Sequence, residues 1–292
     1  MTPLEKYPEL AKALGLRELY FKREDLHPYG SHKGRSIPAM IDHYMEQGSE
    51  EFVISSSGNA ALAAALYIEK INSDPSRISS PMTLDIFVGN HIAPHKLEKL
   101  NALEDDNISV LIKERPLQSA TLASQVGAVS LRQSTDDTAL LGYGALAREL
   151  GSTKGIGAIF MGTSSGTTAQ ALAMYFTNEN QPVQIHIVQT SSCHPIADGI
   201  ETFDGENIDS IADAIVDRTA MRKSALIPLI KKTAGHSWVA SNVEIIAARD
   251  IVRKHTGLEI STNSALSVVG AMQSAYRGWE INGAVVCMIC GE

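Results

Sequence analysis

The sequence predicts an α/β protein built on an open, mainly parallel sheet with helices on both faces. Short apolar runs of strand length alternate along the chain with longer segments that carry apolar residues at helical spacing. The alternation continues from residue 19 to residue 291. Strands and helices that alternate in this way form βαβ units, whose helical connections cover both faces of a parallel sheet.

Each element is predicted from its own local pattern. Strands are expected where a short apolar or β-branched run is bounded by turn residues, at 19–22, 51–55, 83–90, 108–114, 157–162, 183–190 and 284–291. Helices are expected where apolar residues recur at helical spacing, at 37–48, 60–70, 93–103, 135–151, 169–176, 241–257 and 263–279. Residues 191–237 are the least regular part of the chain and are interpreted as a loop that moves or covers a site.

Length and composition indicate a globular protein with a substantial core. The 292 residues suffice for one large domain or two ordinary ones, and 44% are hydrophobic while 20% are charged. The formal net charge of −8 argues against general binding to nucleic acids or acidic membranes. The N-terminal stretch MTPLEKYPEL is charged and contains prolines, so it is interpreted as neither a signal peptide nor an anchor.

Three cysteines, Cys193, Cys287 and Cys290, are too few for a disulfide scaffold. Cys287 and Cys290 formally match C-x-x-C, but they lie in the apolar run AVVCMIC, where alternate side chains face opposite sides of a sheet. A metal or redox site is therefore not expected, and no metal is predicted. The cysteine usage fits a reducing compartment, and a cytoplasmic location is expected.

The turn PYGSHKGRS at 28–36 places Lys33 where a predicted strand and turn lead into a helix. A helix N-terminus favours anions, so a lysine is an unusual choice there. A solvated loop lysine is one reading. The other is a lysine that acts as a neutral amine or is converted to an imine.

Two further strand-to-helix turns can bind anions. Ser55, Ser56, Ser57, Gly58 and Asn59 offer hydroxyls and amides at a helix start, where serine and asparagine are also common simply as caps.

The second such turn combines glycines with hydroxyls, a composition that lets backbone amides surround a phosphate; it comprises Gly162, Thr163, Ser164, Ser165, Gly166, Thr167 and Thr168. It matches neither the P-loop nor GxGxxG, and a plain tight turn is the alternative. In parallel α/β sheets such turns, at the carboxyl ends of strands, are where ligands bind.

One ligand would use all of these features. An aldehyde cofactor that carries a phosphate could form a Schiff base with Lys33, place its phosphate in the 162–167 turn and accept a hydrogen bond from Asn59. The strand end at Cys290 would then face the ring nitrogen. This reading explains why a cation is tolerated at the start of a helix.

The chain resembles the fold type II pyridoxal-phosphate enzymes, the tryptophan synthase β family. Motifs in that family's order span the whole chain: TPL at 2–4, YFKREDLHPYGSHKGRS at 20–36, SSSGNAALAAAL at 55–66, GTSSGTTA at 162–169, NSALS at 263–267 and VVCMICG at 285–291. The resemblance implies two open, mainly parallel twisted sheets with helices on both faces. It also implies a large cofactor-binding domain formed by residues 1–47 and 144–292, with a smaller domain inserted at 48–143.

Roles for individual residues follow from the resemblance. Lys33 is expected to form the Schiff base with pyridoxal 5'-phosphate, and Asn59 to contact the ring oxygen. Ser55, Ser56, Ser57 and Gly58 are expected to bind the substrate carboxylate. The turn from Gly162 to Thr167 is expected to bind the cofactor phosphate. Cys290 stands where relatives have Ser or Thr near the pyridine nitrogen; a weak partner there would favour elimination chemistry.

The C-terminal third is most similar to threonine synthase, through SIADAI at 210–215, SNVEIIAARDIV at 241–252 and GLEISTNSALSVVGAM at 257–272. The resemblance implies a lyase of threonine biosynthesis that converts O-phosphohomoserine and water to threonine and phosphate, and a homodimer. Two departures leave the substrate open: His32 and Gly34 replace Phe and Asp, and Ser261 and Thr262 replace Glu-Pro.

Four alternatives therefore remain. They are a serine or threonine ammonia-lyase, a cysteine synthase-like β-replacement enzyme, a catalytically degenerate binding protein of this fold, and a plain phosphate- or nucleotide-binding module.

Overall fold

A computed structural model describes residues 1–74, 76–203 and 208–291 and confirms the α/β class. The chain forms two compact units. The first contains Met1–His27 together with the chain from Tyr143 onward, and the second contains Pro28–Gly142. An insertion within the larger part is therefore present. Residues 28–47, which the sequence analysis assigns to the larger domain, group with the second unit.

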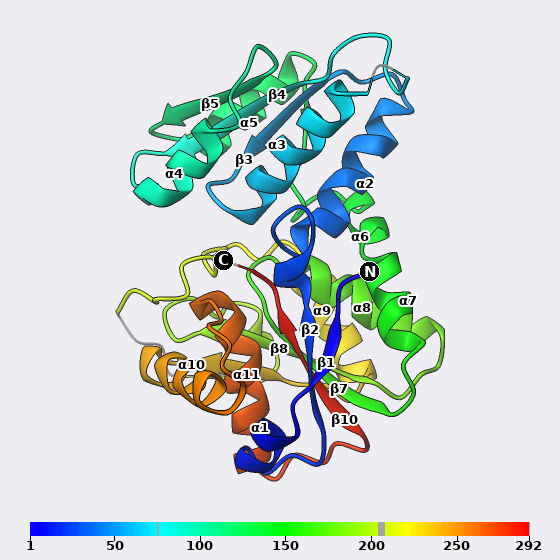
Figure 1. Ribbon diagram of the computed structural model, residues 1–292, viewed down its shortest axis with the longest axis vertical. Coiled ribbons are helices and arrows are strands. Elements are labelled where there is room, and N and C mark those ends of the chain that lie inside the picture. Colours follow the sequence, from blue (N-terminus) through cyan, green and yellow to red (C-terminus); the bar gives the residue numbers. More distant parts are fainter. Residues whose placement is uncertain (75, 204–207, 292) are drawn as a thin grey trace. The chain divides into compact units, whose positions relative to one another are not determined.

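The first unit is built on a six-stranded sheet with the order β1-β2-β10-β7-β8-β9. Its strands are β1 (Leu4–Lys6), β2 (Leu19–Arg23), β7 (Ile156–Gly162), β8 (Gln184–Thr190), β9 (Ser237–Ala240) and β10 (Ala284–Ile289). Only the pairing of β1 with β2 is antiparallel. The carboxyl ends of β7 and β10 therefore lie at the same edge of the sheet, and α8 follows the carboxyl end of β7 (Figure 1).

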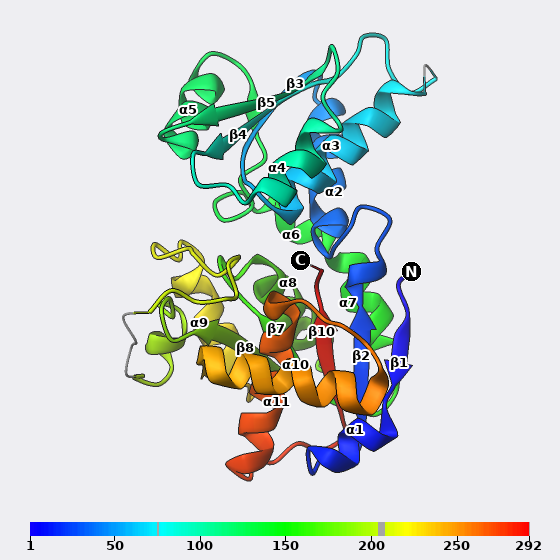
Figure 2. The same cartoon turned by 60° about the vertical axis from the view of Figure 1, so that its left-hand side comes forward.

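Helices cover both faces of this sheet (Figures 1 and 2). The helices of the first unit are α1 (Pro8–Ala13), α7 (Gly144–Gly151), α8 (Thr167–Asn178), α9 (Lys223–Lys232), α10 (Asn242–Thr256) and α11 (Thr262–Tyr276), with short 3-10 turns at Glu24–Leu26 and Ala197–Gly199. Every second residue of these strands faces one core, for example Leu19 and Phe21 of β2, and packs there with α1, α10 and α11. Alternate side chains of a strand point to the same face of the sheet, which explains this spacing.

The second unit has a four-stranded, fully parallel sheet with the order β5-β4-β3-β6. Its strands are β3 (Glu51–Ser55), β4 (Thr83–Gly89), β5 (Ile108–Lys113) and β6 (Val129–Ser130), and its helices are α2 (Lys33–Met45), α3 (Asn59–Asn72), α4 (Pro94–Asn101), α5 (Pro116–Gln125) and α6 (Thr138–Gly142). Phe52 and Ile54 face one core, and Val53 faces a smaller one that includes Ala120 of α5. Both faces of the sheet are covered, as predicted.

Two local predictions are wrong. The single helix predicted over 135–151 is divided at the buried Tyr143 into α6 and α7. A Cβ on Gly142 would lie 2.5 Å from the Cα of Ser36, so α6 packs directly on α2 and the chain then leaves this unit. The region 191–237, interpreted above as a loop, contains the helix α9, which continues through Pro228, and its residues 204–207 lie outside the described residues. Among the described residues, no helix combines the length and apolar character needed to cross a membrane.

Candidate active site

Lys33 is the first residue of α2 and is half-buried. The turn before it depends on Gly30, whose φ of +77° lies in the left-handed region that glycine adopts without strain. A Cβ on Gly30 would lie 3.1 Å from the Leu62 side chain, so this turn packs on the first turns of α3. The buried Ser31 hydroxyl accepts from the Lys33 amide at 3.2 Å. The structure therefore fixes the start of the helix that carries the lysine.

The amine of Lys33 is hydrogen-bonded to a residue that sequence reasoning missed. Its Nζ donates to Oε1 of Gln133 at 2.6 Å. Gln133 is 7% exposed and follows β6 in a turn, one hundred positions along the chain from Lys33. No motif identifies this glutamine, because its position beside the lysine exists only once α2 and the β6–α6 connection have packed.

The turn between β3 and α3 carries the predicted carboxylate site. Ser55 ends β3, Asn59 begins α3, and the amide of Gly58 donates to the Ser56 hydroxyl at 3.3 Å. Ser57 is exposed. The structure thus brings this turn and the turn before Lys33 into one unit, at the amino ends of two helices that pack on each other.

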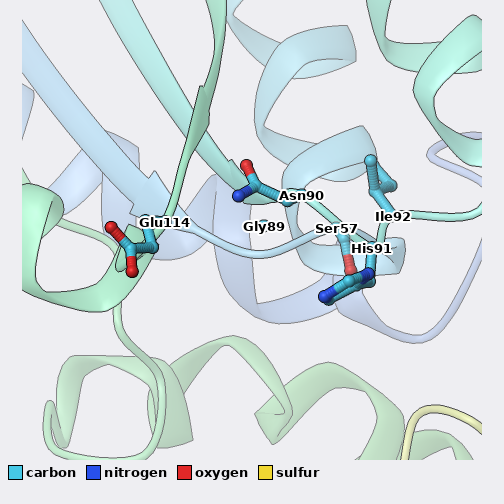
Figure 3. Close-up of a pocket in the computed structure, with 6 residues that line it drawn as sticks. All are labelled: Ser57, Gly89, Asn90, His91, Ile92 and Glu114. Carbon is cyan, nitrogen blue, oxygen red and sulfur yellow. The ribbon is translucent and has the colours of Figure 1, made fainter.

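A pocket with a volume of about 300 Å³ lies beside this turn. It is lined by Ser57, Gly89, Asn90, His91, Ile92 and Glu114, which follow the carboxyl ends of β3, β4 and β5 (Figure 3). Figure 3 shows Ser57 and His91 on the same side of the pocket and Glu114 on the opposite side. Ligands of parallel sheets bind at such strand ends. The pocket therefore places Ser57 of the predicted carboxylate site beside the polar side chains of His91 and Glu114.

The predicted phosphate turn lies in the first unit, between β7 and α8. Gly166 has a φ of +90°, and the Gln170 amide donates to its carbonyl at 2.8 Å, which closes the first turn of α8. The amides that precede this bond point out of the helix end, and the helix dipole adds positive potential there. A Cβ on Gly162 would lie 2.9 Å from the carbonyl oxygen of Asn263, so only glycine fits. The turn has the geometry of an anion site.

The hydroxyls of this turn brace it. Ser164 Oγ accepts from the amides of Val216 and Asp217, both at 3.1 Å. Ser165 and Thr167 share a hydrogen bond of 3.0 Å, and Thr163 is buried. The side chain of Ser164, predicted to bind the phosphate, thus holds the segment 208–221 beside the turn, a use that no local pattern reveals.

Cys290 follows β10 at its carboxyl end and is half-buried. Its amide donates to Ser264 Oγ at 3.0 Å, and the hydroxyls of Ser261 and Ser264 both donate to the carbonyl of Gly291. Ser261, which the sequence analysis notes as a departure from the family pattern, thus links the strand end to the start of α11. Leu266 of the same helix would meet a Cβ on Gly162, so α11 joins Cys290 and the phosphate turn in one unit.

The other half of the C-x-x-C pair is a core residue. Cys287 is fully buried within β10, and its thiol donates to the Ser267 carbonyl at 3.4 Å. Burial raises the pKa of the Cys287 thiol. It therefore packs against α11 as an apolar side chain would, while Cys290 lies beyond the strand.

The residues present fit pyridoxal 5'-phosphate. The second unit supplies a primary amine for the aldehyde and hydroxyls and amides for a carboxylate. The first unit supplies a helix end for a phosphate, in a turn that Gly162 lets pack closely on α11 and in which Gly166 has a positive φ. It also supplies a half-buried thiol at a strand end. The predicted site residues thus form two sets, one in each unit.

Comparison with known proteins gives a concordant result. The sequence model of the family described as "Pyridoxal-phosphate dependent enzyme" matches residues 1–291. The threonine synthase of Mycobacterium bovis is 22% identical over 307 residues, covering 100% of this chain and 81% of that protein.

Solved structures agree in fold. A pyridoxal 5'-phosphate-dependent aspartate racemase has a TM-score of 0.83 at 21% identity, covering 99% of this chain and 89% of its own. The processed form of threonine deaminase isoform 2 from Solanum lycopersicum has a TM-score of 0.80 at 22% identity, covering 99% and 83%. At these identities the structures support the fold alone.

Proposed function

Because the chain belongs to the family of pyridoxal-phosphate-dependent enzymes, we propose that it is a lyase of the threonine synthase type, acting on O-phosphohomoserine. The reaction would release phosphate and add water to give threonine. The main support for the proposal is the placement of Lys33. Its primary amine lies at the first position of α2, with Nζ 2.6 Å from the buried side-chain oxygen of Gln133. The whole-length likeness to threonine synthase supports this choice of reaction.

Each predicted residue has a defined task in this proposal. The bound cofactor supplies an electrophilic centre that joins the substrate amine and withdraws electrons from the neighbouring bonds. Lys33 holds the cofactor through its Nζ and, once released, moves protons between the α and β carbons of the substrate. The turn from Gly162 to Thr167 binds the cofactor phosphate, and Asn59 donates to the ring oxygen.

Substrate contacts come from the β3–α3 turn. Ser55, Ser56, Ser57 and Gly58 bind the substrate carboxylate through hydroxyls and amides at the start of α3. The pocket beside Ser57 takes the substrate's side chain. Cys290 would lie near the ring nitrogen of the bound cofactor, where a thiol would offer only a weak hydrogen-bonding group. That arrangement favours elimination over reactions that need a stronger electron sink.

A second candidate is an ammonia-lyase on serine or threonine. Its support is a stretch of 82 residues that is 39% identical to the L-serine dehydratase/L-threonine deaminase of Bos taurus. Both candidates use Lys33 and differ in the leaving group. A β-replacement enzyme of the cysteine synthase type would share the same site. We also propose a homodimer in the cytoplasm.

Substrate screening with matched variants tests the proposal. Three proteins are compared: the wild type, Lys33→Ala and the control Lys70→Ala, which changes an exposed lysine of α3. Each is loaded with pyridoxal phosphate and offered O-phosphohomoserine, serine, threonine and O-acetylserine. Phosphate and threonine released by the wild type and Lys70→Ala, but not by Lys33→Ala, would support the proposal. A 2-oxo acid from serine or threonine would move the assignment to the ammonia-lyase. Bound cofactor without any product would instead indicate a binding protein.

A further inference from the structure

We propose that Gln133 is a positioning residue that holds the Lys33 amine by a fixed acceptor oxygen and so orients it for attachment to the cofactor. The inference rests on the proposed function, because it concerns the same lysine. The contact is short, with Nζ and Oε1 2.6 Å apart, and Gln133 is 93% buried. Both residues belong to the second unit, so the geometry is internal to one compact body.

A relay of hydrogen bonds fixes which end of the Gln133 amide faces the lysine. Ser36 Oγ donates its single proton to the carbonyl of Ala139 at 2.9 Å. It can then only accept from its other neighbour, Gln133, at 2.7 Å. The group of Gln133 that faces Ser36 must therefore be the NH₂, which leaves Oε1 toward Lys33. The hydrogen-bond network therefore assigns the oxygen and nitrogen of the Gln133 amide, which the shape of the group alone would not distinguish.

The scaffold around this relay holds its members in place. Ser36 lies one turn after Lys33 on α2, so both face the same side of the helix. Gly142 allows α6 to approach α2 closely, which brings the Ala139 carbonyl to Ser36.

The segment that carries Gln133 is anchored at both ends. The Leu131 amide donates to the Val53 carbonyl on one side, and Tyr44 donates to Asp136 at 2.8 Å on the other. These bonds hold the acceptor oxygen of Gln133 beside Lys33.

An acceptor facing the amine has a chemical consequence. A neutral amine has two protons and one lone pair, and donating one proton to Gln133 directs the lone pair elsewhere. A donor in the same place would occupy the lone pair and block the nucleophile. In the attachment step Nζ forms a double bond to the aldehyde carbon while the carbon–oxygen bond of the aldehyde breaks. The aldehyde oxygen leaves as one water that carries both amine protons. The step needs no oxidant or reductant.

The test separates binding from attachment. Apoprotein is mixed with pyridoxal phosphate, and the absorbance of the lysine-bound cofactor is followed at rising concentrations of the aldehyde. The plateau of the rate reports the attachment step, and the half-saturating concentration reports the preceding non-covalent binding. For Gln133→Leu we expect a plateau about tenfold lower, the loss expected for one hydrogen bond to an amine, with an unchanged half-saturating concentration. Ser36→Ala removes the acceptor that fixes the Gln133 amide, so the amide can rotate by half a turn; it should lower the plateau about threefold.

The control is Gln118→Leu, which changes an exposed glutamine of α5 and should behave as wild type. A folded Gln133→Leu protein with the wild-type plateau would overturn the inference. If Gln133→Leu fails to fold, a wild-type plateau in Ser36→Ala would overturn it. So would a crystal structure of the apoprotein with Nζ beyond hydrogen-bond distance of Gln133. If the wild type itself forms no lysine-bound cofactor, the proposed function fails instead, and the two failures are distinguishable.

Discussion

Two strand-to-helix turns look alike in sequence but are built differently. The turn at 162–167 leads into α8, and its hydroxyls brace the protein itself, with Ser164 accepting two backbone amides. The turn at 55–59 leads into α3, its Ser56–Gly58 bond is a long 3.3 Å, and Ser57 is exposed. The room around the glycines of the two turns also differs. A Cβ on Gly166 would lie 2.8 Å from Leu226, whereas a Cβ on Gly58 would meet nothing within 4 Å.

The difference suggests how one protein can bind a permanent and a transient anion. A turn whose side chains are already engaged presents backbone amides in a fixed arrangement, which suits a cofactor phosphate that stays bound. A turn with an exposed hydroxyl and room around its glycine can adapt to a carboxylate that arrives and leaves in each cycle. Substitutions in the two turns should therefore differ in their effects on stability and on binding.

Gly166→Ala should have the largest effect. The positive φ and the 2.8 Å approach to Leu226 combine strain with overpacking, so we expect the free energy of unfolding to fall by about 3 kcal/mol and cofactor binding to weaken sharply. Gly15→Ala is the matched control, since its φ of +69° is similar but a Cβ would meet nothing within 4 Å; it should cost about 1 kcal/mol. Gly58→Ala should stay within about 0.5 kcal/mol of wild type. Denaturant unfolding checks all three, and equal losses at Gly166 and Gly15 would contradict the account.

Acid should destabilise the unit that carries the rigid turn. Burial first, and His236 second, lower the pKa of His186 on β8 to about 3. The ring stays neutral in the folded protein, where its Nδ1 accepts from Trp238 Nε1 at 3.2 Å. An unfolded histidine binds a proton below about pH 6.5, so the unfolded state binds more protons and stability falls as the pH falls from there toward 3.

At pH 4.5 we expect His186 to lower the free energy of unfolding by about 2 kcal/mol relative to pH 7. Denaturant unfolding across this range measures the slope. His186→Gln should flatten the slope although it lowers stability at neutral pH, and His95→Gln, an exposed control, should leave it unchanged. An unaltered slope in His186→Gln would show that another group is responsible.

Ser164→Ala should have an intermediate effect. It removes the acceptor for the amides of Val216 and Asp217, which should cost about 1–2 kcal/mol and weaken cofactor binding about tenfold. Hydrogen exchange at residues 210–217 should quicken at the same time. Ser165→Ala, which loses only the bond to Thr167, is the control and should change less. If exchange is unchanged in Ser164→Ala, the bracing role is refuted.

Ser57→Ala should have the smallest effect on stability, within about 0.5 kcal/mol of wild type, because the side chain is exposed. If its hydroxyl binds the substrate carboxylate, KM should rise about three- to tenfold with little change in kcat. Steady-state kinetics on the substrate found by screening measure both constants. Ser73→Ala, at the exposed serine that directly follows α3, should change neither constant, and an unaltered KM in Ser57→Ala would remove Ser57 from the site.

Local patterns predicted the parts of the molecule that depend on neighbouring residues. The strand run at 51–55, the helix after Asn59 and the position of Lys33 at a helix start all follow from periodicity and turn chemistry. Tertiary packing decides the rest. The break at Tyr143 reflects where the chain passes from one unit to the other, and the Gln133–Lys33 contact joins residues one hundred positions apart. The role of Ser164 likewise depends on a segment about fifty residues away in the sequence.

The most direct test of the central claim is to locate the covalent link to the cofactor. Wild type and Lys33→Ala would be incubated with pyridoxal phosphate, reduced with borohydride and mapped by peptide mass. The account predicts an absorbance band in the wild type and a reduced adduct on the peptide containing Lys33, with neither in Lys33→Ala. An adduct on a different lysine, or no adduct in the wild type, would contradict it and leave the glycine-lined turn at 162–167 to be explained by another ligand.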